Sequence, residues 1–187
     1  PIHSWTPMRT LEKFPDVIAY RDLKIKQAKK ITVEKLEKEN QIIIEKWKEA
    51  KERSKITGEE VRQWPRLKRH PVQSQDFHAN LYNGMIHPLI PYTLRGAIWY
   101  QGEANAKEGA VPYDKTLPLM INDWRTRWDD EFSFYYVQLA NFRQPTTKPG
   151  DDDPWPLLQN RMRLVLDTTP KTGMAIINDV GEADDIH

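Results

Sequence analysis

Polar side chains follow an apolar run at residues 95–98, where the sequence predicts that a buried strand ends. Gln101, Glu103 and Asn105 stand at this point, and Gly102 among them permits a sharp turn. Ligands of open α/β sheets bind in the crevice outside the carboxyl ends of the strands. An amide, a carboxylate and a second amide there indicate a binding site, although a glycine turn that faces water would explain the same residues.

A second strand end carries the pattern of a general base. Residues 172–178 form another apolar run, and Asp184, Asp185 and His187 follow it. A carboxylate three residues before a histidine, as in Asp184 and His187, lies on the same side of a turn. It can accept a hydrogen bond from Nδ1–H and hold the imidazole in the tautomer whose Nε2 serves as base. The pattern alone is common in solvated loops, and its place after a strand favours a base with its orienting carboxylate.

Strands and helices alternate in the second half of the chain. The expected elements are strands at 95–101, 132–140 and 172–178 and helices at 113–128 and 156–168. This alternation implies a parallel sheet with right-handed crossovers. All three strands then end at one edge, where Gln101, Asn141 and the loop with Asp184 and His187 can converge.

Charge is distributed unevenly along the chain. The net charge is +1, but residues 21–70 hold 16 Lys and Arg against 9 Asp and Glu, and residues 71–187 hold 10 against 16. Residues 22–55 lack Gly and Pro and carry an imperfect apolar stripe, which predicts a long or broken, mostly exposed helix. The block is either a solvated helical insertion or an arm that binds nucleic acid or a partner helix. Intermixed charges favour the insertion, and we expect no nucleic-acid partner.

Composition excludes several classes of site. The absence of Cys excludes disulfides, thiolate nucleophiles and cysteine zinc sites. No apolar run approaches the ~20 residues of a membrane helix, and no basic-then-apolar leader is visible. We expect no metal, no cofactor and no membrane partner, and we expect surface or loop positions for His3, His70, His78 and His87. The chain reads as a fragment of a longer protein, expected to be secreted or periplasmic.

Five motifs stand in a characteristic order: Leu81-Tyr82-Asn83-Gly84-Met85-Ile86, Arg95-Gly96-Ala97-Ile98-Trp99-Tyr100-Gln101-Gly102-Glu103-Ala104-Asn105, Asp123-Trp124-Arg125, Val137-Gln138-Leu139-Ala140 and Asp185-Ile186-His187. Together they resemble the sialate O-acetylesterase family of the SGNH-hydrolase superfamily. Residues 1–5 are similar to the segment after that family's Gly-Gly-Thr turn, and the block 21–70 lies where the family tolerates an insertion. The resemblance implies an α/β, flavodoxin-like, three-layer fold with a parallel sheet, of which residues 1–187 form a partial domain.

The resemblance also implies hydrolysis of acetyl esters on sugars by a Ser/His/Asp mechanism, with an acetyl xylan esterase as the alternative. His187 matches the family's catalytic histidine, and its orienting carboxylate is Asp184, which we favour, or Asp185. Gln101 matches a side-chain amide that donates to the oxyanion. Gly102, Glu103 and Asn105 accompany it as oxyanion or substrate-binding residues. The implied partner is a small acetylated sugar or glycan.

The serine nucleophile of this family stands in a Gly-Gln-Ser-Asn-type turn, which this chain lacks. Its serines stand in other contexts: Ser4, Ser54, Ser74 and Ser133. We therefore expect these 187 residues to be inactive by themselves. Trp155, in a Pro-flanked loop, is the candidate for the lip of the substrate site. An interaction module that uses residues 21–70 is the alternative from a different functional class.

Overall fold

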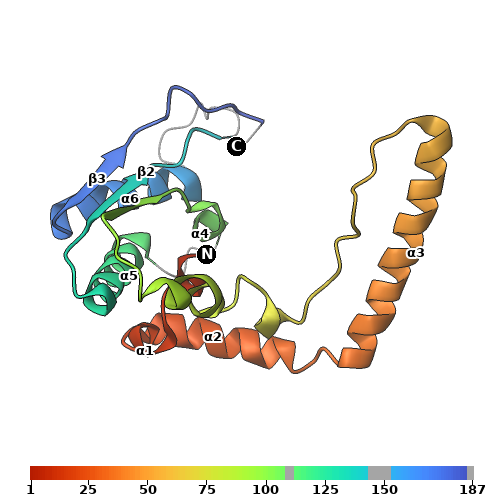
Figure 1. Cartoon of the computed structure of the whole chain (residues 1–187), viewed down its shortest axis with the longest axis horizontal. Helices are drawn as coiled ribbons and strands as arrows, with labels where there is room; N and C mark the ends of the chain where they lie inside the picture. Colours follow the sequence, from red (N-terminus) through yellow and green to blue (C-terminus); the bar gives the residue numbers. More distant parts are fainter. Residues whose placement is uncertain (108–111, 143–152, 185–187) are drawn as a thin grey trace.

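The computed structural model describes residues 1–107, 112–142 and 153–184, and Figure 1 shows their arrangement. In chain order the elements are η1 (Ile2–Ser4), α1 (Met8–Leu11), α2 (Pro15–Ala28), α3 (Val33–Thr57), η2 (Pro71–Gln73), η3 (Tyr82–Ile86), η4 (His87–Leu89), β1 (Gly96–Trp99), α4 (Glu103–Lys107), α5 (Tyr113–Trp128), β2 (Ser133–Val137), α6 (Pro154–Thr168) and β3 (Thr172–Ala175). Among these helices, none is long and apolar enough to cross a membrane.

The three strands form one parallel sheet in the order β1-β2-β3, in which Gly96 pairs with Ser133. Helix α5 precedes β2 and α6 precedes β3, and right-handed crossovers place both helices on the same face. The strands bury Trp99, Phe134 and Tyr136 against these helices. The prediction of an α/β fold with a parallel sheet is confirmed.

The opposite face of the sheet is open to solvent. Ile98 is 90% exposed, and Tyr135, its partner in the register, is 55% exposed. Within the described ranges, the sheet and its helices therefore form two layers. The third layer expected for an SGNH-type domain has no counterpart there.

Arg125, near the end of α5, fixes where β2 and β3 begin. Its side chain is buried, and Nε and Nη2 donate to the Phe132 carbonyl at 3.1 and 2.9 Å. Nη2 also donates to the Lys171 carbonyl at 3.3 Å, and the Glu131 carboxylate lies 3.7 Å from Nη1. Because Phe132 and Lys171 directly precede the two strands, one guanidinium holds both amino ends in line.

Helix α2 packs on the body of the molecule, with Val17 and Ala28 buried. It starts at Pro15, whose fixed φ suits the first turn of a helix. Residue 21, the predicted start of the charged block, lies inside this helix. The segment that departs from the body therefore begins later in the chain.

Residues 33–70, which we call the arm, stand away from the body (Figure 1). The helix expected over 22–55 is broken before α3, because Thr32 caps α3 by accepting from the Lys35 N–H at 3.2 Å. No residue of α3 is buried. The chain returns along this helix, and Asn40 exchanges two hydrogen bonds with the Lys68 backbone. The arm is thus a solvated helix with a return segment.

Candidate functional site

The segments that follow the three strands lie against one another at one edge of the sheet. A Cβ on Gly102, after β1, would lie 3.2 Å from a Leu139 methyl carbon, after β2. A Cβ on Gly181, after β3, would lie 2.7 Å from the Ala140 Cβ and 2.6 Å from the Asn141 backbone oxygen. Both positions leave little room for a side chain, and the strand ends meet as the parallel order predicts.

Gln101 is held at this edge by a tyrosine that the sequence analysis missed. The Tyr113 hydroxyl, at the start of α5, accepts from Trp99 Nε1 at 3.2 Å. It lies 2.9 Å from the Gln101 carbonyl oxygen and 3.1 Å from Oε1, to which it can donate. Burial raises the pKa of Tyr113, so the hydroxyl stays protonated. No sequence signal marks Tyr113, because the first residue of an amphipathic helix reads as part of the core.

The amide nitrogen of Gln101 donates to Asn105 Oδ1 at 3.1 Å. The amide is therefore oriented from both ends, its oxygen by Tyr113 and its nitrogen by Asn105. A primary amide has two N–H groups. One is used on Asn105, and the other is the group that could donate to a developing oxyanion.

Asn105 is buried and joins the amino-terminal segment to the strand end. Its Oδ1 also accepts from the Ile2 N–H at 3.0 Å, across 103 residues of sequence. Glu103, at the start of α4, accepts from the Gly102 N–H at 3.0 Å. Asn105 thus positions Gln101, and the Gly102 N–H is already engaged by a carboxylate.

The base side of the predicted site is described only in part. Asp184 is exposed on a bend three residues after Gly181. Asp185 and His187 lie outside the described residues. The pairing of His187 with Asp184 or Asp185 stays a prediction.

The four serines fill local roles. Ser4 Oγ donates to the Pro1 carbonyl at 2.7 Å, and Ser54 Oγ to the Lys51 carbonyl at 2.8 Å. Ser74 lies in a turn, where its Oγ accepts from the Asp76 N–H. Ser133 is the first residue of β2.

Trp155 corrects one expectation. It is buried, its Nε1 donates to the Ala140 carbonyl at 2.8 Å, and its ring packs on Phe142. It belongs to the core beside the strand ends rather than to an exposed lip.

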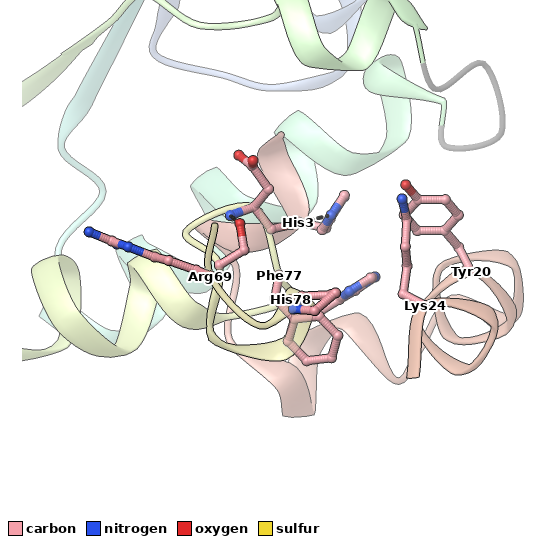
Figure 2. Close-up of a pocket in the computed structure, with 9 residues that line it drawn as sticks. His3, Tyr20, Lys24, Arg69, Phe77 and His78 are labelled. Carbon is pink, nitrogen blue, oxygen red and sulfur yellow. Dashed lines mark hydrogen bonds between the residues drawn. The ribbon is translucent and has the colours of Figure 1, made fainter. Parts of the chain in front are cut away.

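Two histidines expected at the surface are buried instead. His3 on η1 is 1% exposed and His78 is 3% exposed, and their rings stack with centroids 4.2 Å apart (Figure 2). They border a cavity of about 250 Å³ whose lining also includes Tyr20, Lys24 and Phe77. The described residues contain no group of three or more His, Cys, Asp or Glu that could hold a metal ion.

Comparison with known proteins gives consistent relatives. No family model matches the chain. The chain is 34% identical over 122 residues to sialate O-acetylesterase of Homo sapiens, a match that covers 57% of this chain and 22% of the relative. It is 41% identical over 73 residues to the Mus musculus protein of the same name, covering 35% of this chain and 14% of the relative.

A solved structure agrees with these relatives. The crystal structure of a novel carbohydrate acetylesterase from Xanthomonas citri superposes with a TM-score of 0.55 at 44% identity, covering 60% of this chain and 26% of the other. The chain thus spans no more than about a quarter of the length of these proteins. The chain is therefore similar in sequence to sialate O-acetylesterases and in fold to a carbohydrate acetylesterase.

Proposed function

We propose that this chain supplies part of the active site of an esterase that removes acetyl groups from carbohydrates. The observation that carries the proposal is the oriented amide of Gln101 at the edge where the strand ends meet. The names of the relatives support the reaction class, since they are a sialate O-acetylesterase and a carbohydrate acetylesterase. An acetylated sugar or glycan is the proposed substrate.

The proposed mechanism is acyl transfer through a serine that lies outside these 187 residues. His187 takes the proton of the serine as its oxygen attacks the acetyl carbonyl. The free N–H of Gln101 donates to the oxyanion of the tetrahedral intermediate. The protonated His187 then gives its proton to the sugar oxygen as the acetyl–oxygen bond breaks, and water releases acetate by the same steps. Asp184 orients His187, with Asp185 as the alternative.

The first test compares two preparations. The 187-residue chain alone is expected to release no 4-nitrophenol from 4-nitrophenyl acetate above the buffer rate. A longer chain that also carries the serine turn is expected to hydrolyse this ester and an O-acetylated sugar. Activity of the 187 residues alone would place the nucleophile among the four serines described above.

The second test assigns the base and its carboxylate in the active, longer chain. His187→Ala is expected to lower turnover by several orders of magnitude. Of Asp184→Asn and Asp185→Asn, only the true partner should approach this defect. Asp179→Asn, at a nearby exposed carboxylate, is the matched control and should keep the parental rate. A parental rate in His187→Ala would refute the mechanism.

A further inference from the structure

The buried imidazole pair lies where three segments meet. His3 belongs to η1, His78 follows η2, and the ring of Tyr20 on α2 contacts both, with centroids 5.6 Å from His3 and 5.8 Å from His78. Figure 2 shows these rings with Lys24 beside Tyr20. The neighbouring cavity is lined by both histidines.

The hydrogen bonding of the pair is incomplete. His3 Nε2 lies 3.1 Å from the Asp76 carbonyl oxygen. A carbonyl only accepts, so this nitrogen carries the proton of the neutral ring and Nδ1 is unprotonated. His3 Nδ1 and both ring nitrogens of His78 are buried without a hydrogen-bond partner in the described part of the chain. A proton added to His3 Nδ1 would therefore create a buried charge with no acceptor for its new N–H.

The charges around the pair oppose protonation as well. Burial and then the neighbouring His78 lower the pKa of His3 to about 3, while the Asp76 carbonyl acts in the opposite direction. Burial and then Arg21 lower the pKa of His78 to about 4, and the Val17 carbonyl and Asp22 act against them. Lys24 lowers the pKa of both rings. Both imidazoles are therefore neutral while the segments are packed together.

Helix α2 contributes to a small apolar cluster rather than to the main core. Its Val17 belongs to a small apolar cluster with Leu11, Met8 and Phe14, apart from the main core. The main core instead holds Ile2, whose N–H is bound to Asn105. Segments with few buried apolar contacts open locally without global unfolding.

We propose that the stacked His3 and His78 form an acid-sensitive latch, whose protonation releases α2 from the amino-terminal segment and loosens the attachment of that segment to Asn105. In the released state both rings regain an ordinary pKa near 6.5. The released state then binds more protons than the latched state once the pH falls below about 6.5, so latching is fully stable above that pH and weakens below it. Each imidazole shifts the equilibrium by up to about tenfold per pH unit.

Carboxylates do not account for a change in the packing of α2 between about pH 6.5 and about pH 5. Aspartate side chains in peptides titrate near pH 4, below this interval. The interval from about pH 6.5 to about pH 5 therefore reports on the histidines. Because the test of the latch measures packing in the 187-residue chain, its result does not depend on whether the proposed esterase reaction is correct.

The experiment is amide hydrogen exchange of the 187-residue chain at a series of pH values, corrected for intrinsic exchange. Between about pH 6.5 and about pH 5, amides of α2 should lose about tenfold or more of their protection, while those of β2 should keep theirs. His78→Phe, which keeps a stacking ring, should flatten this dependence. His87→Phe, at an exposed histidine, is the control and should leave it unchanged.

Three results would overturn the latch: equal losses in α2 and β2, constant protection of α2, or an unchanged slope in His78→Phe. Where that variant fails to fold, histidine NMR titration of the parental chain decides. The latch requires that His3 and His78 remain neutral at about pH 5.5 wherever α2 amides stay protected. The latch would be excluded if His3 and His78 both titrated with a pKa near 6.5 while the amides of α2 stayed protected from exchange.

Discussion

At the scale of single residues, the candidate site depends on how firmly one amide is held. Gln101 is bound at its oxygen end by Tyr113 and at its nitrogen end by Asn105. Donors fixed in advance stabilise an oxyanion without reorganising during the reaction. Tyr113 is therefore a positioning residue for the proposed chemistry.

This arrangement predicts two graded defects in the active, longer chain. Gln101→Ala should lower kcat by about 10²-fold, because it removes the donor. Tyr113→Phe should lower kcat by about tenfold with little change in KM, because the donor remains but loses its orientation. Steady-state kinetics with an O-acetylated sugar measures both. Tyr135→Phe, on the open face of the sheet, is the control, and parental kinetics in Tyr113→Phe would contradict the positioning role.

The residue types in the sequence predicted the polar cluster at the strand ends, but they did not predict the tyrosine that holds Gln101 in place. Gln101 and Asn105 were predictable because amides after an apolar run are unusual unless they bind something. Tyr113 was not, because its value lies in contacts with Trp99 and Gln101 that only the packed chain creates. The burial of His3 was not predicted for the same reason, because the sequence around a histidine gives no sign of its tertiary contacts.

At the scale of elements, Arg125 links α5 to the amino ends of β2 and β3. Removing a buried charged donor leaves the carbonyls of Phe132 and Lys171 without their partner. Arg125→Leu should therefore lower the free energy of unfolding by about 2–4 kcal/mol. Urea denaturation of the 187-residue chain measures this change.

The matched control for that change is Arg163→Leu on α6. Arg163 forms an exposed ion pair with Asp167 one helical turn away. Such pairs contribute about 0.3–0.5 kcal/mol. Equal losses in the two variants would mean that Arg125 does not align the strands.

Element types followed from periodicity, while element ends did not. The strand predicted at 95–101 ends at Trp99, and that predicted at 172–178 ends at Ala175. A strand continues only while a neighbour offers ladder hydrogen bonds, and that depends on register. Helix caps depend more on local sequence than strand ends do. Thr32 and Gly58, at the two ends of α3, are residue types that favour cap positions.

At the scale of the whole molecule, the arm is separable from the body. No residue of α3 is buried, and α2 packs against η2, so the two ends of the arm are near each other. Replacing residues 33–68 by a short Gly/Ser linker should change the free energy of unfolding of the body by about 0.5 kcal/mol or less. Circular dichroism should show the loss of one long helix with an unchanged cooperative transition.

A non-cooperative transition after this replacement would show that the arm stabilises the body. The sequence predicted an exposed charged helix here because its apolar stripe is imperfect. It did not predict that residues 62–68 return along α3, because the Asn40–Lys68 and Trp47–Arg62 contacts join polar groups without periodic pattern. Parallel strand order, by contrast, was predictable from alternation alone.

The amino-terminal segment has a consequence for synthesis on the ribosome. Ile2 binds Asn105, and the Trp5 carbonyl accepts from Trp124 Nε1 across 119 residues of sequence. At about 5–20 residues per second, Ile2 waits on the order of 5–20 s before its partner is made. During that interval the apolar side chain of Ile2 has no native core to pack into, so this segment stays exposed until residues 105–124 have been synthesised.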